Sequence, residues 1–191
     1  MQNKEKINSS LMQLKEITEG FDNYFMQKEV QNNKIEKVEQ LLKEEKENST
    51  TPQDIVNIRN SDGYSLLMLS KTADMSQLLI ENGAEVNYIA PDGSTALLLA
   101  VKNNNRKQVE TLLRAGAKAE IKDLKTGYNA LMLSQNNDIS YLLLKAGANP
   151  NFVANDGLTP LSKATKENNH QLLNMLHQFG AQINWSDVIK K

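Results

Sequence analysis

Hydrophobic residues recur along the chain in short paired runs separated by polar segments. A run such as Leu66–Leu69 or Ala96–Ala100 is followed by a polar break and by a second run at helical spacing, which ends in paired leucines such as Leu78-Leu79. This alternation predicts a helix, a turn and a second helix in each unit. Since a helical pair this short cannot bury its apolar stripe alone, we expect neighbouring pairs to stack.

Glycines mark the same units at fixed intervals. Gly-Ala pairs begin at residues 83, 116, 147 and 180, and turn glycines stand at 63, 93, 127 and 157, so the distances are 20, 23, 20 and 23 residues (83−63, 116−93, 147−127, 180−157). Each marker returns after 64 residues (127−63), and residues 61–120 laid over 125–184 share 25 identities in 60 pairs. The pattern indicates a duplicated two-repeat block. In both copies one unit lacks three residues, around 70–74 and 134–138, which predicts a shorter first helix or turn there.

Turn chemistry follows the same spacing. The Gly of each Gly-Ala pair comes just after a second helix, where a left-handed residue is favoured. Asp-Gly pairs at 92–93 and 156–157 predict tight turns at the tips of projecting loops.

The sequence DGLTPLSKA at residues 156–164 and DGSTALLLA at 92–100, with Val86-Asn87 and Pro150-Asn151 after the Gly-Ala pairs, resemble the ankyrin-repeat family. The resemblance covers about residues 21–184. It implies an all-α solenoid of stacked helix-turn-helix units with projecting loops or hairpins, about five repeats including caps, and an additional N-terminal helix. The family's His after Thr-Pro-Leu is replaced by Met68, Leu98, Met132 and Ser162, so its Thr–His hydrogen bonding is missing. We expect Met68 and Met132 to be partly buried between repeats.

The resemblance and the spacing divide the chain into four parts. We expect an amphipathic helix over residues 1–20, an N-capping repeat over 21–60 with a long polar loop at 44–54, four repeats over 61–184 (61–90, 91–123, 124–154 and 155–184), and a C-terminal cap or tail over 185–191. Asn32-Asn33 is expected in the inter-helix turn that Asn104-Asn105 and Asn168-Asn169 occupy later. The apolar seam of the first helix, Ile7 to Phe25, is expected to cover the first repeat or to bind a partner, and Ile183 and Trp185 are expected to seal the last repeat.

Composition narrows the possible functions. With 22 basic against 23 acidic residues the chain has no field to gather phosphate, so no nucleic-acid partner is expected. No apolar run is long enough to cross a bilayer, and no signal-peptide pattern opens the chain, so we expect no membrane insertion. The absence of cysteine excludes disulfides and thiolate sites. We expect a cytoplasmic chain, with a mature secreted or periplasmic chain as the alternative, and the Asn- and Lys-rich composition favours a bacterial source.

Catalytic and metal chemistry have little support in the sequence. His170 and His177 lie two turns apart on one predicted helix without a third ligand nearby in sequence, so we expect no metal and no cofactor, and a local capping role for His170. No nucleophile elbow or Gly-rich oxyanion loop is present, and the Asp-Gly pairs lack the pattern of a calcium loop. We expect no enzyme.

The family resemblance implies a protein-interaction module that binds a partner protein through its concave face and loop tips, as an adaptor, an effector or an inhibitor of the immunity type. The alternative is a structural protein that oligomerises through the N-terminal helix, although we expect the chain alone to be a monomer. Among the implied contacts, Tyr64 and Tyr128 are expected to be aromatic anchors, or else to pack between adjacent loops. The implied contact residues are Ser61, Asp62, Tyr64, Pro91, Asp92, Ser94, Lys102, Asn103, Lys125, Thr126, Tyr128, Asn155, Asp156, Leu158, Lys166 and Glu167.

Overall fold

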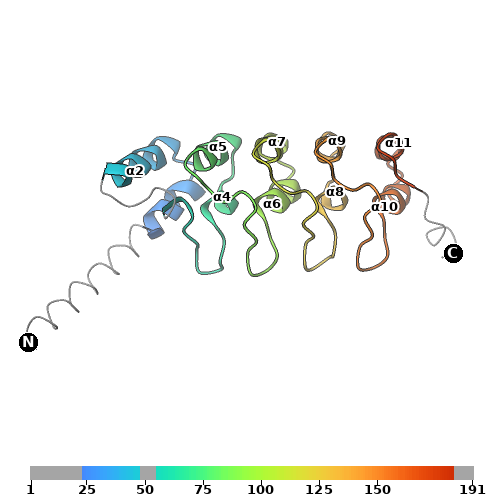
Figure 1. Cartoon of the computed structure of the whole chain (residues 1–191), viewed down its shortest axis with the longest axis horizontal. Coiled ribbons are helices and arrows are strands. Elements are labelled where there is room, and N and C mark those ends of the chain that lie inside the picture. The colour runs from blue at the N-terminus through green and yellow to red at the C-terminus, as the bar shows by residue number, and fades with distance from the viewer. Residues whose placement is uncertain (1–22, 48–54, 183–191) are drawn as a thin grey trace, which may run out of the picture.

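The computed structural model describes residues 23–47 and 55–182, and it arranges them as two layers of short helices with loops projecting from one side (Figure 1). The first helices of the four repeats are α4 (Leu66–Leu69), α6 (Ala96–Lys102), α8 (Ala130–Leu133) and α10 (Pro160–Lys166). The second helices are α5 (Ala73–Glu81), α7 (Arg106–Arg114), α9 (Asn137–Lys145) and α11 (His170–Gln178). Within the described ranges, no helix combines the length and apolar character that a membrane span requires.

An additional helical pair, residues 23–31 and α2 (Ile35–Glu47), precedes these repeats (Figure 1). Met26, Val30, Val38 and Leu42 of this pair are buried and belong to the same core as the repeats that follow. The seam predicted for the N-terminal helix and the cap predicted around Trp185 lie outside the described residues, apart from the end of the seam at Phe25.

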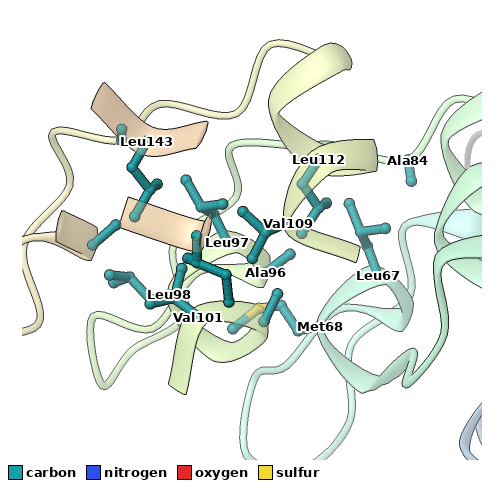
Figure 2. Close-up of a cluster of buried hydrophobic side chains, with 14 of the residues drawn as sticks. Leu67, Met68, Ala84, Ala96, Leu97, Leu98, Val101, Val109, Leu112 and Leu143 are labelled. Atoms are coloured by element: carbon teal, nitrogen blue, oxygen red, sulfur yellow. The ribbon is translucent and has the colours of Figure 1, made fainter. Parts of the chain in front are cut away.

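The helical pairs stack as the apolar runs predict. Each first helix packs on the next first helix and each second helix on the next second helix, which joins the separate apolar stripes into one continuous core. Figure 2 shows the centre of this core, where Leu67, Leu97 and Leu112 are each no more than 2% exposed. Met68 and Met132 are also buried, at 6% and 1% exposed, so their burial is more complete than the partial burial predicted for them.

The repeats alternate in length as the two deletions predict. Helices α4 and α8 have four residues each, whereas α6 and α10 have seven, so the missing three residues remove almost one turn of each shorter helix. The chain leaves α4 at Ser70, which is extended and buried. The Gln108 side chain reaches this point from α7 and donates to the Ser70 carbonyl at 2.9 Å and to Ser76 Oγ at 2.9 Å. The buried Gln108 amide therefore supplies a hydrogen-bond donor to the Ser70 carbonyl, at the point where the shortened helix ends.

Left-handed residues occupy the predicted positions. Each Gly-Ala glycine has positive φ, between 84° and 93°, and the turns between paired helices place Asn33, Asn104 and Asn168 at φ between 53° and 55°. Because Asn33 takes the conformation of Asn104, Asn32-Asn33 matches Asn103-Asn104 and not Asn104-Asn105. The predicted register of this turn was wrong by one residue, since three consecutive asparagines at 103–105 admit either alignment.

The predicted polar loop at 44–54 is also corrected in part. Helix α2 continues to Glu47, so the first four residues of that segment are helical. The sequence from Gln40 to Glu47 contains strong helix formers and neither Gly nor Pro, which lets the helix continue. Residues 48–54 lie outside the described part of the chain.

Asparagine side chains connect each loop base to the following repeat. The Asn87 amide donates to the Gly116 carbonyl at 3.0 Å, and its Oδ1 accepts from the Lys118 backbone N–H at 2.8 Å. Asn57 and Asn151 make the same pair of bonds, to the carbonyls of Gly83 and Gly180 and from the backbone N–H groups of Glu85 and Gln182. In the third junction Glu120 stands in the asparagine position and accepts only the Asn149 N–H, at 2.7 Å.

Candidate interaction surface

Four loops project side by side from the first helices, and side-chain oxygens close their turns. In the second and fourth loops a turn glycine donates its N–H three residues back, and an aspartate Oδ1 accepts a backbone N–H two residues ahead, from Ser94 to Asp92 and from Leu158 to Asp156. Asn60 Oδ1 takes this role in the first loop. These local bonds fix each tip without help from a partner.

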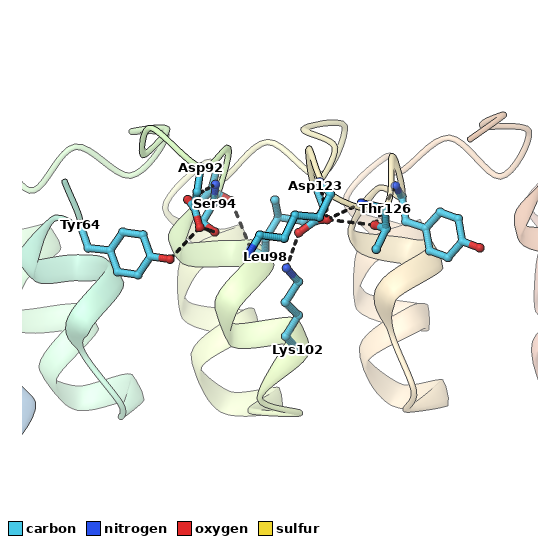
Figure 3. A network of polar contacts seen from close by, with 10 residues as sticks. Tyr64, Asp92, Ser94, Leu98, Lys102, Asp123 and Thr126 are labelled. Atoms are coloured by element: carbon cyan, nitrogen blue, oxygen red, sulfur yellow. Dashed lines mark hydrogen bonds and ion pairs between the residues drawn. The ribbon is translucent and has the colours of Figure 1, made fainter. Parts of the chain in front are cut away.

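The third loop has a different turn. It contains one more residue than the others, since its glycine follows the preceding Gly-Ala glycine by 11 residues (127−116) instead of 10 (93−83). The Gly127 N–H accordingly donates four residues back, to the Asp123 carbonyl at 2.8 Å. Asp123 Oδ1 accepts from the backbone N–H of Lys125 and from both the backbone and the hydroxyl of Thr126 (Figure 3).

Tyrosine hydroxyls connect loops across the stack. Tyr64 points from the first loop toward the second and donates to Asp92 Oδ2 at 2.7 Å (Figure 3). Tyr128 makes the same bond to Asp156 Oδ2 at 2.8 Å. These hydrogen bonds raise the pKa of each tyrosine. The pKa of Asp92 is lowered, mainly by the Tyr64 bond, and that of Asp156 is lowered by the Leu158 N–H and then by Tyr128. Of the two roles considered for these tyrosines, packing between loops is the one present in the free chain.

Close backbone approaches hold the tips together as well. A Cβ placed on Gly63 would lie 2.6 Å from Pro91 Cδ, one placed on Gly93 would lie 2.2 Å from Leu124 Cγ, and one placed on Gly127 would lie 2.5 Å from Asn155 Cγ. A Cβ on Gly157, in the last loop, would meet no atom within 4 Å, whereas the turn glycines of the first three loops lie directly under a side chain of the next loop. Glycine is required there by space as well as by its positive φ.

Lys102 and Asp123 form an ion pair between the end of α6 and the third loop (Figure 3). The Asp123 side chain is 4% exposed, whereas that of Lys102 is 36% exposed. Burial alone would raise the pKa of Asp123, but the hydrogen bonds from Lys102 and Thr126 outweigh it and lower that pKa from 3.8 to about 2. Lys102 is one of the predicted contact residues, but nothing in the sequence pattern indicates Asp123 as its partner.

A second cluster at the loop bases was also missed. The Arg59 guanidinium lies 4.0 Å from the centroid of the Tyr88 ring and pairs with Glu85 at 2.8 Å. The Tyr88 hydroxyl donates to the Gly63 carbonyl at 3.0 Å, so the cluster fastens the second loop to the first. Arg59 and Tyr88 lie four and five residues before the turn glycines of adjacent loops (63−59 and 93−88), so a basic and an aromatic residue at neighbouring positions of the repeat were the signal that could have indicated this cluster.

Most of the predicted contact residues lie on this surface with exposed side chains. Ser94 is the exception, since it is 5% exposed and donates its hydroxyl to Asp92; it is removed from the contact set. Tyr64, Asp92, Tyr128 and Leu158 are partly buried. The exposed members are Ser61, Asp62, Pro91, Lys102, Asn103, Lys125, Thr126, Asn155, Asp156, Lys166 and Glu167.

The histidine prediction needs one correction. His170 is the first residue of α11, but Asn169 is the N-cap and accepts from the Leu172 N–H at 3.0 Å. Among residues 23–47 and 55–182, no group of three or more His, Asp or Glu side chains lies close enough to hold a metal ion.

Comparison with known proteins shows to which family the chain belongs. A family model described as ankyrin repeats in three copies matches residues 26–123 and 109–187, and the chain belongs to the ankyrin-repeat family. Ankyrin repeats generally serve as protein–protein interaction modules.

Individual relatives are similar over part of their length. An ankyrin-repeat protein of fowlpox virus is 33% identical over 135 residues, which are 66% of this chain and 40% of that protein. The human transient receptor potential cation channel subfamily A member 1 is 30% identical over 155 residues, 72% of this chain and 13% of the channel. An ankyrin-repeat-containing protein of Treponema pallidum is 27% identical over 123 residues, 63% of this chain and 41% of that protein. The chain therefore spans less than half of each of these relatives.

Proposed function

We propose that this chain binds another protein through the loop tips and the exposed ends of α6 and α10, without carrying out chemistry on it. The observation that carries the proposal is that successive tips are fastened to one another by the Tyr64–Asp92 and Tyr128–Asp156 bonds. A row of tips fixed in this way loses little conformational entropy on binding, which favours affinity for a protein surface.

The positions of the exposed side chains support the same binding surface. Asn103 is the C-cap of α6, Lys166 is the last residue of α10, and Asn155 and Lys125 stand at loop tips. Exposed polar side chains from helix ends and from loop tips therefore flank the repeat that contains the shortened α8. We propose little backbone change on binding, because the turns are already closed by side-chain oxygens of their own loops. Occupation of a partner's surface is sufficient for an inhibitor, an effector or an adaptor, and we propose a role of this kind for the chain as a monomer in the cytoplasm.

A site-specific cross-linking experiment tests the proposal. A photoreactive phenylalanine analogue is placed at Asn155, on a loop tip, and in a matched variant at Lys145, an exposed residue that ends α9 in the other helical layer. Both variants are irradiated in an extract of the source cells, and adducts are identified by mass spectrometry. We expect one protein adduct that depends on the Asn155 position and is competed by the unmodified chain. Equal labelling from both positions, or labelling that excess unmodified chain does not reduce, would contradict the proposal.

A further inference from the structure

The third loop carries the most exposed large aliphatic side chain in the described part of the chain. Leu124 is 60% exposed, although its side chain also lies against the backbone of the second loop at Gly93. The neighbouring loops carry Ile89 at 51% and Val153 at 55% exposed. Three consecutive loops thus each present one aliphatic side chain to solvent, and burial of such side chains against a partner is favourable at about 25 cal/mol per Å².

Leu124 does not occupy the loop position that Ile89 and Val153 share. Ile89 and Val153 each precede the residue that opens the hydrogen-bonded turn, Ala90 and Ala154, and Lys122 precedes Asp123, which opens the turn of the third loop. Lys122 therefore stands at the loop position that Ile89 and Val153 occupy on either side. It is exposed, as is Lys125 on the far side of Leu124.

The third loop differs from the other three loops in the charge of its side chains. The first, second and fourth loops carry Asp62, Asp92 and Asp156 next to their turn glycines. The third loop has Lys125 and Thr126 there. Glu120 lies at the base of this loop, and nearer the tip the loop together with Lys102 holds three lysines against the carboxylate of Asp123. Since the Asp123 carboxylate is 4% exposed and already paired with Lys102, Lys122 and Lys125 are the charges that the tip of this loop presents to solvent.

The loop is also held in place before any contact forms. Asp123 Oδ1 accepts three hydrogen bonds from Lys125 and Thr126, and its Oδ2 pairs with Lys102 of α6. The buried Asp123 carboxylate therefore fixes this loop to the end of α6, and so holds Leu124 in place between Lys122 and Lys125. Such a rigid, locally positive site with an apolar centre is complementary to a segment of opposite charge that carries an apolar side chain.

We propose that Lys122, Leu124 and Lys125 form the primary contact for a partner segment in which an aliphatic or aromatic side chain is flanked by carboxylates. The apolar side chain packs against Leu124 and its neighbours Ile89 and Val153, and the carboxylates pair with Lys122 and Lys125. This inference rests on the proposed function and adds the chemistry of the partner to it.

A displayed library of random twelve-residue peptides is the probe for this site. The library is selected against the full chain and, in parallel, against a chain with Lys122→Glu and Lys125→Glu. We expect the peptides enriched on the unmodified chain to combine Asp or Glu with a large apolar residue, and to lose at least about tenfold in affinity on the double variant. Their affinity for the unmodified chain should also fall as salt is raised.

Two further variants separate charge from packing. Leu124→Ser should weaken the same peptides about tenfold without altering their salt dependence, because it removes only apolar contact. Lys118→Glu with Lys145→Glu is the matched control, since it makes the same change in net charge at exposed positions away from the loop tips, and it should leave affinity within about twofold. Circular dichroism of every variant establishes that the fold is retained.

Two results overturn the inference. One is enrichment of neutral or basic peptides, and the other is enrichment of acidic peptides whose affinity is insensitive to Lys122, Leu124 and Lys125. In either case a cross-link from Asn155 to a partner protein would leave the proposed function standing. The opposite outcome is also distinguishable. If acidic peptides bind and require Leu124, but the Asn155 variant gives no cross-link that unmodified chain competes away, the chemistry of the site is upheld and the function proposed for the row of loops is contradicted.

Discussion

Tyr128 donates its hydroxyl hydrogen to Oδ2 of Asp156, and so links the tip of one loop to the tip of the next over 2.8 Å. Tyr64 and Asp92 repeat the relationship 64 residues earlier, which shows that the duplicated block preserves the contact and not only the helices. A tyrosine bound in this way has its hydroxyl occupied in the free chain. A partner therefore meets the exposed part of the ring and the carboxylate, but not a free phenol.

Removal of one of these hydroxyls should loosen a loop without unfolding the stack. In Tyr128→Phe the ring remains and only the bond to Asp156 is lost, so we expect backbone N–H groups of the fourth loop to exchange with solvent roughly threefold to tenfold faster. The pKa of Asp156 should rise toward its ordinary value, since one of the bonds that lowers it is gone. Hydrogen exchange and a carboxyl titration by NMR measure the two effects. Tyr141→Phe, on α9, is the control and should change neither.

Acid should weaken the chain through Asp123. Its pKa is about 2 in the folded chain, against 3.8 for an ordinary aspartate carboxyl. A group whose pKa is lower in the folded state stabilises that state above its unfolded pKa and loses the contribution as pH falls through the folded pKa. We therefore expect about 2 kcal/mol of stability to disappear between roughly pH 4 and pH 2 from this residue.

The variant Asp123→Asn tests this assignment by urea unfolding at several pH values. It should be less stable than the unmodified chain by about 2 kcal/mol at pH 7, because the charged hydrogen bond between Lys102 and the buried carboxylate is lost while the amide oxygen still accepts from Thr126. The difference between the two chains should narrow below about pH 4, where Asp123 begins to be protonated in the unfolded state. A difference that stays constant down to pH 2 would show that Asp123 does not titrate in this range.

The stack could be predicted from the sequence because it repeats. The 64-residue period placed the turn glycines, the paired helices and the shortened α4 and α8, since each feature occurs at least twice and so stands out from chance. The buried positions of Met68 and Met132 followed from the same alignment. Repetition also predicted the exposed loop tips, though not how they are fastened.

Features that occur once, or that depend on three-dimensional contact, could not be found in this way. The Lys102–Asp123 pair joins residues 21 apart in a loop with an extra residue, a spacing that no helix or strand period produces. The burial of Ser94 follows from its hydroxyl bond to Asp92, which the turn pattern alone does not specify. The extension of α2 to Glu47 was obscured by the Ser-Thr-Thr-Pro sequence that follows, whose turn signal was assigned too early in the chain.

A substitution at Glu120, in the third junction between repeats, should increase the stability of the chain. Glu120 accepts the Asn149 N–H but, as a carboxylate, has no hydrogen to donate to the Gly147 carbonyl, whereas an asparagine makes both bonds at the other three junctions. Glu120→Asn should therefore stabilise the chain by about 0.5–1 kcal/mol through one added hydrogen bond. Urea unfolding at neutral pH measures this change. Asn87→Ala, which removes both bonds at an intact junction, should destabilise by about 1–2 kcal/mol and confirms that the method resolves effects of this size.

Asn129 offers a second site where a substitution should stabilise the chain. Its Oδ1 caps α8 by accepting the Met132 N–H at 3.0 Å, but its Nδ2 is buried without a hydrogen-bond partner among the described residues. A buried, unpaired donor costs about 1–3 kcal/mol. Thr95 shows that a threonine in the same position caps α6 with its hydroxyl, accepting the Leu98 N–H, while its methyl group suits an apolar site.

Asn129→Thr should therefore keep the cap, remove the unpaired amide and raise stability by about 1 kcal/mol. Asn129→Ala removes the amide and the cap together, and should be less stable than Asn129→Thr by about 1 kcal/mol, the ordinary contribution of an N-cap. The order of the three unfolding midpoints is the measurement, with Thr above Asn. If Asn129→Thr unfolds at a lower urea concentration than the unmodified chain, with an unchanged slope, then the amide is satisfied in solution and the buried site next to α8 is more polar than its contacts indicate.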